Sequence, residues 1–74
     1  MKKVIILAGN GDLPYLIASS LKKEKIEFSI IAFENNKTTN KLNKFSPKQI
    51  NFGKIVTELK KLKKKNYNEL IMVG

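Results

Sequence analysis

The chain has 74 residues, with 15 Lys or Arg against 6 Asp or Glu, so its formal net charge is +9. It contains neither Cys nor His, which excludes a disulfide scaffold, a zinc site and Cys or His catalysis within these residues. This length is enough for one domain, residues 1–74.

The positive charge points to an anionic neighbour, such as nucleic acid, a phosphorylated ligand or an acidic membrane surface. Every basic residue is Lys. The absence of Arg argues against nucleic acid, because Lys lacks the bidentate guanidinium fork that favours base and phosphate recognition. A Lys- and Asn-rich proteome would explain the same composition, and the sequence leaves both explanations open.

The first predicted element is a strand over residues 4–8, an unbroken apolar run. A run without alternation is typical of a parallel sheet covered on both faces. It is shorter than the apolar region of a signal peptide, and no apolar stretch in the chain approaches the length of a membrane span. We therefore expect a cytoplasmic protein.

A helix is predicted over residues 13–24, after a turn formed by Gly9, Asn10 and Gly11. Asp12 is a suitable N-cap, and Pro14 falls in the first turn, where its missing N–H does no harm. Helical spacing predicts a buried stripe. The residues of that stripe are Leu13, Leu16, Ile17 and Leu21.

The second predicted strand, residues 28–33, ends just before Glu34. Residues 35–47 are polar and are interpreted as a surface connection with room for one helical turn around residues 39–44. Residues 49–52 suit a brief edge strand, since Pro47 before it is acceptable at an edge.

The second helix is predicted over residues 54–65, and a last buried strand over residues 69–73. The predicted buried stripe of this helix consists of Ile55, Val56, Leu59 and Leu62. The pattern β-α-β-(β)-α-β predicts an α/β fold with a parallel sheet, a Rossmann-like half in the order 3-2-1-4. Because the chain stops at Gly74, directly after a strand, we expect the domain to be incomplete.

The glycine turn is the first candidate ligand site. Backbone N–H groups at Gly9 to Gly11 could approach a phosphate in front of the following helix. However, Pro14 stands where a dinucleotide fingerprint needs Gly, and Asp12 brings a negative charge. The turn is therefore either a tight turn with a helix cap, or also borders a ligand through sugar or amide groups.

Two other features could contact a ligand. Glu34 lies 23 residues after Gly11, near the offset at which a carboxylate holds a nucleotide ribose, although an ordinary exposed Glu is the simpler explanation. The Lys-rich face of the helix at 54–65 could bind nucleic acid or an anionic membrane, or could simply be solvated. No catalytic set is recognisable in the chain.

The run from residue 6 to residue 14, followed by Ile17-Ala18, resembles the N-terminus of the metal-dependent UDP-2,3-diacylglucosamine pyrophosphatases of lipid A synthesis. Residues 51–54, a helix and residues 70–74 resemble that family's next landmarks, in the same order. The similarity spans all 74 residues but only the first part of a full-length member.

The resemblance implies a Rossmann-like N-terminal domain, a larger catalytic domain and an active site between them. It implies magnesium or manganese directing water at the substrate's diphosphate, with UMP and 2,3-diacylglucosamine 1-phosphate as products, at the cytoplasmic face of the inner membrane.

On this resemblance the chain forms one wall of the cleft for a nucleotide-activated lipid, carries no catalytic or metal-binding residue and is inactive alone. The inner-membrane surface is a second expected partner. The alternative is a free-standing basic module that uses the Lys-rich helix. The predicted substrate-binding residues are Gly9, Asn10, Gly11, Asp12, Leu13 and Glu34.

Overall fold

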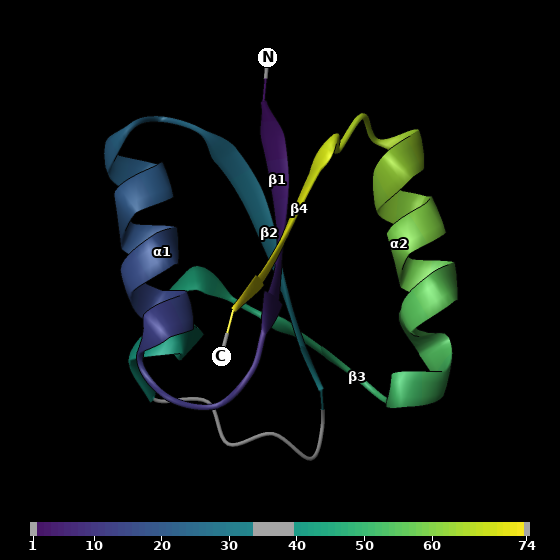
Figure 1. Ribbon diagram of the computed structural model, residues 1–74, viewed down its shortest axis with the longest axis horizontal. Coiled ribbons are helices and arrows are strands. Elements are labelled where there is room, and N and C mark those ends of the chain that lie inside the picture. The colour runs from purple at the N-terminus through teal and green to yellow at the C-terminus, as the bar shows by residue number, and fades with distance from the viewer. Residues whose placement is uncertain (1, 34–39, 74) are drawn as a thin grey trace.

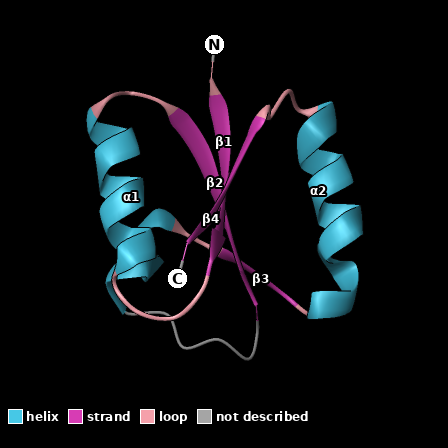
Figure 2. Cartoon of the chain, viewed as in Figure 1, coloured by secondary structure: helices cyan, strands magenta, loops and turns pink. Residues whose placement is uncertain are grey.

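A computed structural model describes residues 2–33 and 40–73 of the chain. Strands alternate with helical segments along the sequence (Figure 2). In chain order the elements are β1 (Lys3–Ala8), α1 (Leu13–Lys23), β2 (Glu27–Phe33), η1 (Asn40–Phe45), β3 (Lys48–Ile50), η2 (Phe52–Lys54), α2 (Ile55–Lys64) and β4 (Glu69–Val73).

The four strands form one parallel sheet in the order β3-β2-β1-β4. In this register Leu7 of β1 lies between Ile31 of β2 and Met72 of β4. The helices α1 and α2 lie on opposite sides of the sheet (Figure 1). The predicted α/β class, the strand order and the Rossmann-like half are thereby confirmed.

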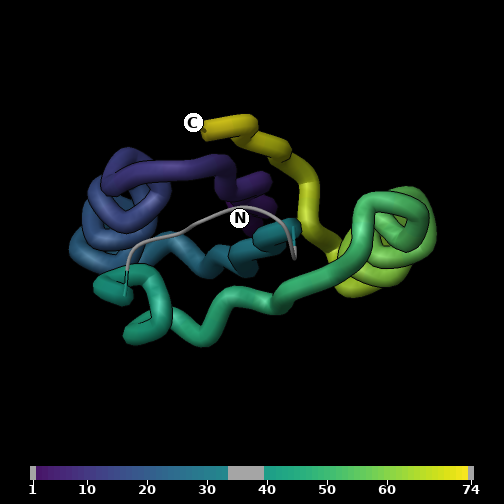
Figure 3. Tube along the Cα trace, turned by 90° about the horizontal axis from the view of Figure 1, so that it is seen from below, coloured from purple at the N-terminus to yellow at the C-terminus, as the bar shows by residue number. Residues whose placement is uncertain are grey.

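Each face of the sheet has its own apolar cluster, because successive strand side chains point to opposite faces. On one face, Ile6 of β1 packs with Ala18 of α1 and Leu42 of η1. On the other, Ile5 packs with Leu62 of α2. Figure 3, seen along the sheet from below, shows the helices on either side and the strands between them.

The buried side of α1 differs from the predicted stripe. Leu13 and Leu16 are 51% and 56% exposed, whereas Pro14 and Ala18 are buried. The other two predicted residues, Ile17 and Leu21, do pack against the core. The helix is therefore rotated relative to the prediction, with Pro14 and Ala18 buried in place of Leu13 and Leu16.

The predicted stripe of α2 is wrong at one position. Val56 is 60% exposed, while Glu58 is only 8% exposed. Lys48 of β3 explains this burial, since its ammonium lies 3.0 Å from the Glu58 carboxylate. A buried carboxylate needs such a partner, and the partner is supplied by a strand rather than by the helix itself.

Most predicted boundaries shift by one or two residues. The edge strand predicted at 49–52 ends at Ile50, because Asn51 accepts a hydrogen bond from the Gly53 N–H at 2.9 Å and starts η2. The second helix is one residue shorter than predicted at each end. The helical turn expected around residues 39–44 is η1.

We predict that Leu62→Ala will lower the free energy of unfolding by about 2–5 kcal/mol, because it leaves a cavity under α2. The matched substitution on the same helix, Val56→Ala, should change it by less than about 0.5 kcal/mol, because Val56 is mostly in water. Urea denaturation of both variants measures the difference. Equal losses would mean that the predicted stripe, and not the one seen here, faces the sheet.

Candidate functional site

The glycine turn after β1 is fixed to the last strand. The Gly9 N–H donates to the Val73 carbonyl oxygen at 2.6 Å. Gly11 has a φ of +91°, a conformation that side chains rarely adopt. Asp12 is at the N-cap of α1, as predicted, but its φ and ψ are helical and its side chain makes no capping hydrogen bond. The predicted capping bond is therefore absent.

This turn is a poor cradle for a phosphate. The Gly9 N–H is already used by Val73, and Pro14, in the first turn of α1, has no N–H to offer. The Asp12 side chain is exposed at the helix N-terminus, where its carboxylate would repel an anion. The geometry thus favours a neutral group of a ligand at this turn over a phosphate.

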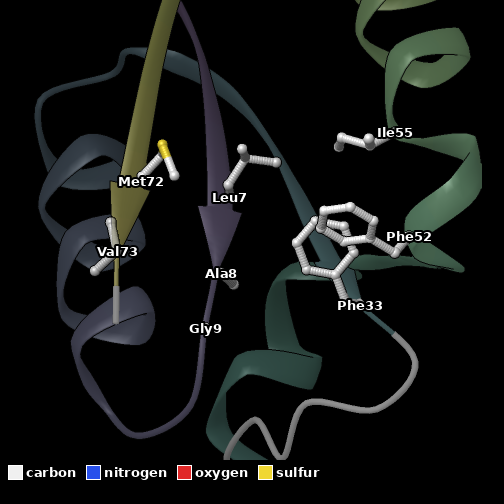
Figure 4. A pocket seen from close by; sticks show the side chains of 8 residues that line it. All are labelled: Leu7, Ala8, Gly9, Phe33, Phe52, Ile55, Met72 and Val73. Carbon is white, nitrogen blue, oxygen red and sulfur yellow. The ribbon is translucent and has the colours of Figure 1, made fainter.

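Beside the turn, a pocket of about 370 Å³ opens at the carboxyl edge of the sheet, on the side covered by α2. It joins the ends of β1, β2 and β4 to the start of α2 (Figure 4). Its lining side chains are all apolar. The lining residues are Leu7, Ala8, Gly9, Phe33, Phe52, Ile55, Met72 and Val73.

Two aromatic rings form one end of this carboxyl-edge pocket. The centroids of Phe33 and Phe52 are 5.2 Å apart, with the ring planes tilted by 40°. Phe52 is 75% exposed, and Met72, which also lines the pocket, is 78% exposed. Leu7 and Ile55 point toward the same space from opposite sides (Figure 4). A cluster of large apolar side chains in contact with water is more often a binding surface than an accidental exposure.

The predicted site residues fall into three groups. Gly9 lines the pocket. Asn10, Gly11, Asp12 and Leu13 lie exposed on the neighbouring turn. Glu34 lies outside the described residues.

Of the eight lining residues, sequence reasoning named only Gly9 as a site residue and missed seven, including Phe33, Phe52 and Met72. Two signals were available. Phe33 and Met72 stand near the carboxyl ends of predicted strands, and Phe52 is a large apolar residue beside Asn51 and Gly53, in a stretch that favours a turn.

The donors for a metal ion are sparse. Within residues 2–33 and 40–73, no three His, Cys, Asp or Glu side chains come together. The resemblance placed its magnesium or manganese in the catalytic domain and not in these residues, so that metal stays a prediction. In the same part of the chain, no helix is long and apolar enough to cross a membrane.

Residues 3–74 match the family model described as LpxI N-terminal domain. The chain belongs to the LpxI N-terminal domain family. Comparison with curated proteins gave no match. The match supports a place in lipid A biosynthesis, as the resemblance implied.

The family match corrects the predicted function. LpxI is a different lipid A enzyme from the metal-dependent pyrophosphatases, and nothing in the match points to those. The predicted role, a wall of a cleft for metal-directed cleavage of the diphosphate, is therefore wrong. The match to a domain of a lipid A enzyme gives no support to the alternative of a free-standing basic module.

We predict that Gly11→Ala will lower the free energy of unfolding by about 1–2 kcal/mol. A Cβ at Gly11 would meet no atom within 4 Å, so the loss comes from the backbone conformation alone. Gly11→Asn should lower the free energy of unfolding by less, because Asn tolerates positive φ better than Ala. Thermal unfolding compares the two, and an Ala variant as stable as the parent would contradict the φ of +91°.

Proposed function

We propose that this chain is the ligand-binding domain of an LpxI-type hydrolase of lipid A biosynthesis. Its ligand is a nucleotide-activated, acylated sugar, held at the carboxyl edge of the sheet. The observation that carries this proposal is the apolar pocket that opens beside the glycine turn, at the edge where open α/β sheets bind their ligands. Family membership supplies the lipid A context.

In this proposal the chain binds and orients the ligand. The pocket excludes water from the apolar part, and the turn from Gly9 to Leu13 borders the polar part next to it. Glu34 directly follows β2 in the sequence, and we propose that it too contacts the ligand. We assign no bond-breaking step to the described residues, because the pocket lining offers neither a nucleophile nor a metal-ligand group.

The charge of the chain fits a location beside a membrane. A net charge of +9 is attracted to anionic lipids, which would keep the domain near an acylated ligand. We therefore propose that the protein works in the cytoplasm, at the surface of the inner membrane.

Titration of the ¹⁵N-labelled chain with UDP-2,3-diacylglucosamine tests this function. We expect the backbone amides of Gly9, Asn10 and Gly11 to shift in a saturable way, together with those of Phe33 and Phe52. Amides at the opposite edge, such as Lys3 and Glu27, should stay in place. UMP, which has no acyl chain, serves as the control ligand and should bind more weakly.

Two outcomes would contradict the proposed function. One is the absence of any saturable shift at the carboxyl edge. The other is a set of shifts confined to the lysines of α2 that disappears when salt is added, because exposed charges are screened while apolar burial is not.

A further inference from the structure

We propose that the carboxyl-edge pocket holds a hydrocarbon chain, so that it is the acyl-chain subsite of this domain and not the site for the nucleobase. The identity of the natural chain as part of an acylated sugar rests on the proposed function. The preference of the pocket for a hydrocarbon follows from its own chemistry, and the experiment below tests it separately.

The side chains of the pocket offer almost nothing for a polar ligand to bond with. None of its eight lining side chains carries a hydrogen-bonding donor or acceptor, apart from the weakly accepting thioether of Met72. Gly9 is the turn residue in the lining, and its backbone N–H is already bonded to the Val73 carbonyl oxygen. A uracil ring placed here would lose its water and find no side-chain partner for its polar edge, which is unfavourable.

The same lining suits an aliphatic chain. The rings of Phe33 and Phe52 stand at one end, and Leu7 and Ile55 face each other across the space (Figure 4). Met72 reaches the pocket from the neighbouring strand β4. Its unbranched side chain adapts to irregular apolar partners, as a chain of variable length requires.

Size separates this pocket from a packing defect. Its volume of about 370 Å³ far exceeds the ~30 Å³ that one water molecule occupies, and it falls within the range of small-molecule sites. Phe52 and Met72 are exposed to water in the free chain, so a hydrocarbon ligand would gain by covering both.

Neutral n-alkyl glucosides are the test ligands, used below their micelle concentrations. The chain has two methionines, so ¹³C-methyl-methionine labelling gives one reporter within the pocket, Met72, and a second signal from Met1. We expect the Met72 signal to move on titration. Affinity should rise about fourfold for each added methylene, which makes octyl glucoside roughly 15-fold tighter than hexyl glucoside.

Phe52→Ala and Val56→Ala form a matched pair. Both side chains are largely exposed and lie close together in sequence, but only Phe52 lines the pocket. Phe52→Ala should weaken octyl glucoside binding about tenfold, whereas Val56→Ala should leave it unchanged. Met72→Gln replaces an exposed apolar side chain by a polar one and should also weaken binding. Calorimetry measures the binding of this variant.

Several results would overturn the inference. These are affinity that does not depend on chain length, equal effects of Phe52→Ala and Val56→Ala, or saturable displacement of the Met72 signal by uridine but not by the glucosides. Binding of the glucosides as expected, with no carboxyl-edge response to UDP-2,3-diacylglucosamine, would instead overturn the proposed function while keeping the pocket as a hydrocarbon site.

Discussion

The structure depends on the burial of β1 between two strands and two helical layers. Ile6 is completely buried, and Val4 and Ala8 are each 1% exposed. Because alternate side chains of one strand enter opposite clusters, β1 must be apolar from Val4 to Ala8 and must be covered on both faces. The placement of α1 and η1 on one face and α2 on the other follows from this single requirement.

The two edges of the sheet are built differently. At the amino edge, the Lys3 ammonium donates to the Lys65 carbonyl oxygen at 2.6 Å and lies 3.4 Å from the Glu27 carboxylate. The Tyr67 hydroxyl accepts a hydrogen bond from Ser29 at 2.8 Å. These polar contacts tie β1, β2 and the segment before β4 together. The carboxyl edge instead carries exposed Phe52 and Met72 around an apolar pocket.

Much of this fold could be predicted from the sequence, because the strands are continuous apolar runs and the glycine turn marks the first strand–helix junction. The faces of the helices were harder. Leu16 and Val56 have the hydrophobicity and spacing of buried residues, yet they are exposed, while Ala18 and Glu58 are buried. A small side chain becomes buried when the sheet approaches closely, and a carboxylate when Lys48 reaches it. Neither condition is visible in the helix sequence itself.

The sequence by itself determined the α/β class, the strand order and the position of the Gly9–Gly11 turn at the carboxyl edge, because these depend on local runs and on general connection rules. Only the tertiary structure decided what surrounds that turn. Phe33, Phe52 and Met72 come from three separate elements, and the sheet register and the approach of α2 bring them around one space. The bond from Gly9 to Val73 likewise joins residues 64 positions apart. This bond can form only because β4 lies beside β1. It occupies the Gly9 N–H, which the sequence suggested as a donor to phosphate.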